Sequence, residues 1–81
     1  MKKTIEMQHF AGFRDLRGCA SESYDTTAAS PRELFLELGL QEAVPLESHW
    51  LKVAINDDFA EWDDPLEAGD RVVFMMPMSG G

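Results

Sequence analysis

The sequence predicts an α+β domain with a mixed β-sheet and one main helix packed on one face of the sheet. Segments with the alternating pattern of strands lie near both ends of the chain, and a single well-capped helix lies between them. The 81 residues leave room for one domain and one modest core. We therefore expect residues 1–81 to form a single domain, from which residues 77–81 protrude as a flexible C-terminal tail.

The first strand is predicted at residues 3–10, where apolar and polar side chains alternate. His9 falls on the apolar face of this strand and has no second histidine at short spacing. We therefore expect His9 to pack in the core, and we expect no metal site. Residues 12–20 contain two glycines and several charged side chains, so they are predicted to form a loop or wide turn. A second, weaker strand is expected at about residues 21–27.

The main helix is predicted to run from Pro31 to about Leu38. Ser30 is a suitable N-cap, proline is favoured at the first helical position, and Glu33 completes a capping box. Apolar residues recur in this segment at spacings of three and four, which predicts one buried face. Gly39 is the expected left-handed stop.

Further strands are predicted in the second half of the chain. Alternation over residues 50–56 indicates a strand, and Asn56 with the two following aspartates predicts a turn. Phe59 and Trp62 lie in a short extended piece, and we expect both to pack in the core. Residues 63–70 are predicted to form one helical turn and a tight bend.

The last strand is expected at residues 71–76. A terminal strand placed beside the first strand would run parallel to it in a mixed sheet. This order of elements predicts the ubiquitin-like β-grasp arrangement. It leaves the C-terminal tail projecting from a well-anchored strand.

Charge and composition narrow the classes of partner. The net charge is −8, and seven acidic residues lie between Asp57 and Asp70 with no lysine or arginine among them. Such a segment repels nucleic acid and attracts a basic protein surface, although it could also serve only to keep the protein in solution. No apolar stretch approaches the roughly 18 residues of a membrane span, so we expect no membrane partner. The single cysteine, Cys19, is expected to be an incidental thiol, and it fits a reducing, cytoplasmic location.

The most informative feature is the ending Ser79-Gly80-Gly81, which closely follows the last apolar strand. Glycine has no Cβ, so this tail is thin enough to thread its carboxylate into a narrow cleft of another protein. A carboxylate becomes an acyl donor when a partner enzyme converts it to an acyl-adenylate with ATP. The alternative interpretation is a frayed chain end.

Several segments of the chain occur in a characteristic order. Leu51–Asn56, Trp62–Phe74 and Pro77–Gly81 follow one another, and residues 10–16 near the N-terminus read Phe-Ala-Gly-Phe-Arg-Asp-Leu. Together these segments resemble the small subunit of molybdopterin synthase, a β-grasp sulfur carrier of the MoaD/ThiS family. The resemblance covers nearly the whole chain and is weakest over residues 17–50.

The resemblance implies a carrier that is not a catalyst alone and binds no cofactor. Its terminal glycine, here Gly81, would be adenylated by an E1-like adenylating enzyme that uses ATP, and then converted to a thiocarboxylate. The tail, with Gly80 and Ser79, would enter the large subunit of molybdopterin synthase. There it would donate sulfur to cyclic pyranopterin monophosphate and so build the dithiolene of molybdopterin.

The resemblance also implies which side chains contact the partner proteins. These are Phe74, Met75, Pro77 and Met78 around the start of the tail, and Arg14 in the first loop. Met75 replaces an aromatic residue of the family pattern, and Met76 replaces a proline. Methionine is flexible and adapts to irregular pockets, so we expect docking with a less rigid tail.

Three alternative functions remain open. The thiocarboxylate could serve another acceptor, as in thiazole formation for thiamine. The protein could be a ubiquitin-like modifier whose Gly81 forms isopeptide bonds with lysines, or a plain interaction module with an idle tail. An independent enzyme is not expected, because no nucleophile–base pair or glycine-rich phosphate loop is present.

Overall fold

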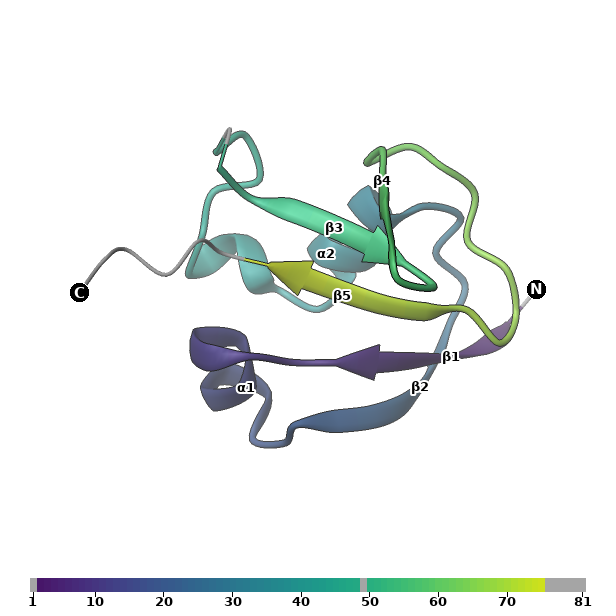
Figure 1. The fold of residues 1–81 in the computed structure, drawn as a ribbon, viewed down its shortest axis with the longest axis horizontal. Coiled ribbons are helices and arrows are strands. Elements are labelled where there is room, and N and C mark those ends of the chain that lie inside the picture. Colours follow the sequence, from purple (N-terminus) through teal and green to yellow (C-terminus); the bar gives the residue numbers. More distant parts are fainter. Residues whose placement is uncertain (1, 49, 76–81) are drawn as a thin grey trace.

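A mixed five-stranded sheet forms the centre of the computed structural model, which describes residues 2–48 and 50–75 (Figure 1). The strands lie in the order β2-β1-β5-β3-β4. Along the chain, the described elements are β1 (Lys3–Gln8), α1 (Ala11–Arg17), β2 (Ser21–Thr26), α2 (Pro31–Glu37), the 3₁₀ helix η1 (Leu40–Glu42), β3 (Lys52–Ile55), β4 (Asp58–Ala60) and β5 (Arg71–Met75).

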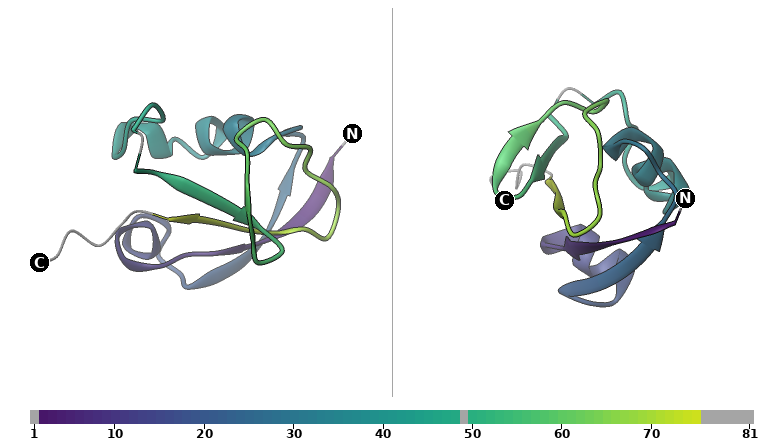
Figure 2. Two further views of the ribbon diagram at one scale, coloured as in Figure 1. Left: turned by 45° about the horizontal axis from the view of Figure 1, so that its top comes forward. Right: turned by 90° about the vertical axis from the view of Figure 1, so that its right-hand side faces the viewer.

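The central pair of strands is parallel. Strands β1 and β5 lie side by side with Glu6 opposite Arg71 and Gln8 opposite Val73, whereas the pairs β1–β2, β3–β4 and β3–β5 are antiparallel. The predicted pairing of the terminal strand with the first strand is therefore confirmed. The sheet curves around α2, which lies on its concave side (Figure 2). This is the β-grasp arrangement that the order of elements predicts.

Helix α2 begins and ends with the predicted signals. The Ser30 side chain accepts a hydrogen bond from the backbone N–H of Glu33 at 3.3 Å, and the Glu33 side chain accepts one from the backbone N–H of Ala29. Gly39 follows the helix with φ of 75°, a left-handed conformation that favours glycine. The helix buries Leu34 and Phe35 completely against the sheet.

Four aromatic rings form the centre of the core. Phe35 contacts Phe13, Trp62 and Phe74 edge-on, with ring centroids 5.1–6.2 Å apart. Trp62 stacks on Phe74 at 5.7 Å with an interplanar angle of 7°. Edge-to-face and stacked pairs of this kind add stabilisation beyond the area that they bury. The rings come from α1, α2, β5 and the loop after β4, so they hold these four segments together.

The structure corrects two of the predicted loops. Residues 12–20 do not form only a loop, because Ala11–Arg17 is helical and Gly18, with φ of 75°, ends this helix. Phe13 is 1% exposed, so its burial in the core stabilises a helix that local sequence signals do not predict. Residues 63–70 contain no helical turn. Instead, the carboxylates of Asp64 and Asp70 accept hydrogen bonds from the backbone N–H groups of Glu61 and Glu67 and close two turns.

No helix among residues 2–48 and 50–75 has the length and apolar character that a membrane crossing requires.

Replacing Ser30 by alanine tests the start of α2. Ser30→Ala removes the acceptor for the Glu33 N–H, so we expect the free energy of unfolding to fall by about 1 kcal/mol. Urea denaturation measures this change, with Ser21→Ala in exposed β2 as the matched control that should stay within about 0.5 kcal/mol of wild type. Equal stability of the two variants would show that the cap contributes nothing.

Candidate functional site

An apolar patch lies on the outer face of the sheet, the face opposite α2. Phe59 is 78% exposed and Phe10 is 57% exposed, which is unusual for large aromatic side chains. A shallow hollow of about 250 Å³ runs between them. We use "apolar patch" for the five residues Phe10, Ala54, Phe59, Val73 and Met75.

Strand register explains why these side chains gather. Phe59 in β4 lies opposite Ala54 in β3, and Ala54 lies opposite Val73 in β5, so the three form a row across the sheet. Phe10 follows the end of β1, and Met75 ends β5. Because β1 and β5 are parallel, their carboxyl ends meet at the same edge of the sheet. The patch therefore reaches the edge at which residues 76–81 leave β5.

The other half of the outer face is polar. On β1 and β2, Thr4 donates a hydrogen bond to Asp25 and Ser23 donates one to Glu6, each at 2.6 Å. The apolar surface is thus confined to β3, β4, β5 and Phe10. Within the patch Ala54 and Val73 are each 8% exposed, so Phe10 and Phe59 supply most of its accessible apolar area. Exposed aromatic side chains beside an apolar hollow are typical of a protein interaction site, since covering them removes apolar area from water at about 25 cal/mol per Å².

The predicted partner-binding residues divide into three groups. Phe74 is only 1% exposed and its ring packs in the aromatic core, so its position does not support the predicted contact with partners. Its neighbour Met75 points to the opposite face and is partly exposed, and Arg14 is exposed on α1. The predicted tail residues Pro77, Met78, Ser79, Gly80 and Gly81 lie outside the described residues.

Phe59 was expected to pack in the core, but its side chain is exposed on the outer face of the sheet. Asn56 and Asp57 have φ of 54° and 75°, which makes a tight two-residue turn between β3 and β4. That turn fixes the register, so Phe59 faces the same side as Ala54. The alternation of β3 and the turn signal at Asn56 and Asp57 were visible in the sequence. The side on which Phe59 lies follows from them only when the pairing of β4 with β3 is known. Trp62, in contrast, packs against the core as predicted.

Several of the seven acidic residues between Asp57 and Asp70 make contacts within the protein. Asp57 pairs with Arg71 at 2.6 Å and Asp63 pairs with Arg32 at 2.8 Å. The Arg32 guanidinium lowers the pKa of Asp63 below its ordinary value. Two further aspartates of the run, Asp64 and Asp70, close the turns described above. Four of the seven carboxylates, those of Asp57, Asp63, Asp64 and Asp70, therefore take part in contacts of the β3–β4 turn and the loop after β4.

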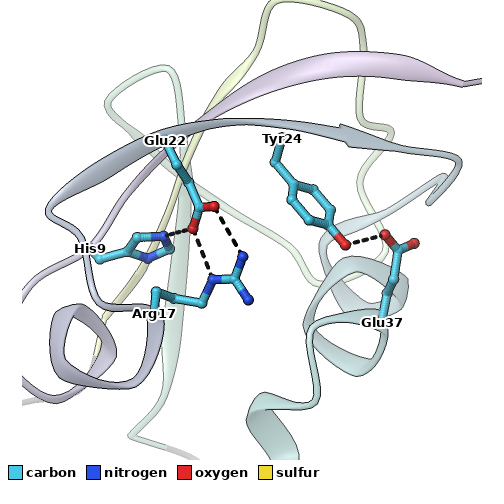
Figure 3. Close-up of polar contacts among 5 residues, drawn as sticks. All are labelled: His9, Arg17, Glu22, Tyr24 and Glu37. Carbon is cyan, nitrogen blue, oxygen red and sulfur yellow. Dashed lines mark hydrogen bonds and ion pairs between the residues drawn. The ribbon is translucent and has the colours of Figure 1, made fainter.

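A second polar cluster lies on the helix side of the sheet (Figure 3). His9 is 2% exposed, and its Nε2 lies 2.7 Å from Oε2 of Glu22. Arg17 donates from Nε and a terminal nitrogen to the two oxygens of the same carboxylate, at 2.8 and 3.0 Å. Cys19 completes the group, because one donor atom each from Cys19, His9 and Glu22 lie within 4.8 Å of one another. The expected burial of His9 is confirmed, but sequence reasoning missed its proximity to Cys19.

Glu22 is the most perturbed acid of this cluster. Its pKa is lowered from 4.5 to about 2. The hydrogen bonds from Arg17 are the largest cause, the contact with His9 acts in the same direction, and partial burial opposes both. Arg17 also lies over the Tyr24 ring at 5.7 Å, and Tyr24 donates a hydrogen bond to Glu37 of α2 at 2.7 Å (Figure 3). The ionised carboxylate thus connects β2 with α1 and the end of β1.

We expect the stability that Glu22 contributes to depend on pH. Its pKa is depressed in the folded state, so this stability is present above about pH 4.5 and is lost as the pH falls towards 2. Urea midpoints measured across this range should fall more for wild type than for Glu22→Gln, which already lacks the charge at neutral pH. Exposed Glu67→Gln is the control and should follow wild type. Parallel curves for wild type and Glu22→Gln would contradict this role.

Solved structures with similar folds come from archaea and bacteria. Small archaeal modifier protein 1 from Haloferax volcanii has a TM-score of 0.79 and 17% identity, over 94% of this chain and 99% of that chain. A putative molybdopterin converting factor subunit 1 from Pyrococcus furiosus has a TM-score of 0.73 and 24% identity, over 94% and 99%. A complex of subunits 1 and 2 of the molybdopterin-converting factor from Helicobacter pylori matches with a TM-score of 0.59 and 23% identity, over 96% and 99%.

At these identities the structural matches show the fold. No curated protein sequence matches the chain. The sequence profile of the ThiS family matches residues 7–81, which is nearly the whole chain. The chain therefore belongs to the ThiS family of ubiquitin-like sulfur carriers.

Proposed function

We propose that the protein carries sulfur as a thiocarboxylate on Gly81 and donates it in molybdopterin synthesis. The observation that carries this proposal is the apolar patch at the edge of the sheet where β5 ends, on which Phe10 and Phe59 are exposed. A carrier needs a surface that a partner recognises next to the reactive end of its chain. The family match, which extends to Gly81, and the likeness to molybdopterin converting factor subunits support the same function.

The chemistry uses the backbone carboxylate of Gly81 and no side chain of the carrier. An E1-like partner would transfer AMP from ATP to this carboxylate, releasing pyrophosphate. A sulfur donor would then displace AMP and leave the thiocarboxylate. Attack of this sulfur on a side-chain carbon of cyclic pyranopterin monophosphate would form a carbon–sulfur bond as an oxygen substituent leaves that carbon. Hydrolysis of the resulting acyl–sulfur bond would then leave the sulfur on the pterin and return the carboxylate for another cycle. Since ATP and reduced sulfur are both needed, we place these steps in the cytoplasm, with no cofactor bound to the carrier.

The apolar patch would dock on the large subunit of molybdopterin synthase and on the adenylating enzyme in turn. The bacterial neighbour is a complex of two molybdopterin-converting factor subunits, which supports a large-subunit partner. Phe10 and Phe59 present rigid rings, and aromatic side chains are frequent anchors at protein interfaces. Met75 between them supplies a flexible contact.

A second candidate is a protein modifier joined through Gly81 to lysines of other proteins. It is favoured by the likeness to small archaeal modifier proteins. Both functions begin with the same acyl-adenylate, and they differ in whether sulfur or a lysine amine attacks it. If the protein is a sulfur carrier, the alternative to molybdopterin synthesis is that its sulfur is used to form a thiazole.

Sulfur transfer can be tested in a single turnover. We expect the protein thiocarboxylated at Gly81, mixed with a molybdopterin synthase large subunit, to convert cyclic pyranopterin monophosphate to molybdopterin. Because each carrier holds one sulfur and a dithiolene needs two, product should saturate near one molybdopterin per two carriers. A chain extended by one residue beyond Gly81 should give none. Binding without molybdopterin formation, together with activity in a thiazole-forming reaction, would assign the carrier to the other pathway.

The apolar patch can be tested separately from the tail. Phe59→Asp places a charge at the most exposed side chain of the patch, and we expect it to weaken binding to the large subunit at least tenfold, or by about 1.4 kcal/mol. Leu36→Asp is the matched control, since Leu36 is 45% exposed but lies on α2, away from the patch. Calorimetry measures both affinities, and thermal melting confirms that both variants are folded. If Leu36→Asp weakens binding and Phe59→Asp does not, the partner docks on the helix side.

A further inference from the structure

The cluster around Glu22 contains an unused set of metal-binding atoms. His9 lies just after β1, Cys19 lies in the turn after α1, and Glu22 lies in β2, so three segments contribute one donor atom each. The imidazole of His9 is buried, and the side chains of Cys19 and Glu22 are partly exposed. The proposed sulfur transfer uses none of these residues.

We propose that His9, Cys19 and Glu22 together bind one zinc ion. Thiolate, imidazole and carboxylate are the three side-chain donors that Zn²⁺ takes in proteins, and the thiolate disfavours hard cations such as Mg²⁺. Three protein ligands leave the fourth tetrahedral position to water, and this side of the cluster is open because the Glu22 side chain is 20% exposed.

The spacing of the donor atoms is close to what such a site needs. With zinc–ligand bonds of about 2.0–2.3 Å, tetrahedral ligands stand roughly 3.3–3.8 Å apart. The three donor atoms already lie within 4.8 Å of one another. Nε2 of His9 and Oε2 of Glu22, at 2.7 Å, would have to separate slightly to admit the ion. The β1–β2 pairing includes Glu22, and the backbone N–H of His9 donates to the carbonyl of Ala20 at 2.8 Å just beyond it, so these backbone positions are held while the side chains rotate.

Arg17 is the group that faces the proposed ion, and its position is compatible with it. The guanidinium bonds both oxygens of Glu22, so Oε2 can turn to zinc while Oε1 keeps its bond to the terminal nitrogen of Arg17. Carboxylates that bind a metal commonly accept such an outer hydrogen bond. Contact with the Tyr24 ring keeps Arg17 in place when its Nε bond to Oε2 is lost. Binding converts the Cys19 thiol to a thiolate, and its proton passes to solvent.

A bound ion would connect the end of β1, the α1–β2 turn and β2. Phe10 of the apolar patch directly follows His9, so the metal would also hold the segment that presents this ring. This consequence does not depend on the cargo of the tail.

Zinc and cobalt titrations of the full, reduced chain test the proposal. We expect one Zn²⁺ per chain, a higher Tm with Zn²⁺ but not with Mg²⁺, and a Co²⁺ complex whose near-ultraviolet absorption shows a sulfur-to-metal charge-transfer band. Cys19→Ser should remove that band and weaken Zn²⁺ binding by about tenfold or more. The Tm of Cys19→Ser without metal confirms that this variant is folded.

His49→Gln is the matched control, because it removes the other histidine of the chain and leaves the cluster intact. It should bind both metals as wild type does. The proposal is overturned if Co²⁺ gives no thiolate band, if Cys19→Ser binds Zn²⁺ like wild type, or if loss of His49 abolishes binding. None of these outcomes bears on sulfur transfer from Gly81, so the two proposals fail independently.

Discussion

The parallel pairing of β1 with β5 is the constraint on which the rest of the structure depends. It joins the two ends of the described chain at the centre of the sheet, and backbone hydrogen bonds from Glu6 to Asp70 and from Gly69 to Thr4, both of 2.8 Å, continue it at one end. All intervening elements must fit around this pair. Because parallel strands end at the same edge, the pairing also brings Phe10 and Met75 together where the C-terminal residues begin.

Strand β5 serves the core and the candidate site at the same time. Its side chains alternate, so Val72 and Phe74 point into the core while Val73 and Met75 line the apolar patch. Phe74 packs against Phe35 and Trp62, which anchors the strand from the helix side. The residues that follow β5 are thus joined to a strand that is anchored in the core. A rigid attachment favours a reactive tail, because less conformational freedom is lost when a partner binds it.

Elements with strong local signals could be predicted from the sequence. The capping serine, proline and glycine around α2 and the alternation in β1 and β5 depend on near neighbours in the chain, and these elements were predicted correctly. Helix α1 was missed because it is stabilised mainly by burial of Phe13 against Phe35 and Phe74, which are distant in sequence. Tertiary contacts of this kind override weak local propensity.

The candidate sites were harder to predict, because each depends on strand pairing. Phe59 faces outward only because the β3–β4 turn sets its partner as Ala54, and Phe74 faces inward because of its place in β5. Likewise, His9 and Cys19 come together through the β1–β2 pairing. The reactive role of Gly81, in contrast, was predicted from the sequence ending and the family resemblance, and it remains a proposal.

Intact-mass measurement of the protein isolated from its native cells tests the central claim most directly. Sulfur carriage predicts a population in which one oxygen has been replaced by one sulfur, and fragmentation should locate that exchange at Gly81. Thiol-blocking alkylation before analysis distinguishes this sulfur from a modified Cys19, since the two lie in different fragments. A chain found only as the plain carboxylate, or only joined through Gly81 to lysines of other proteins, would contradict sulfur carriage.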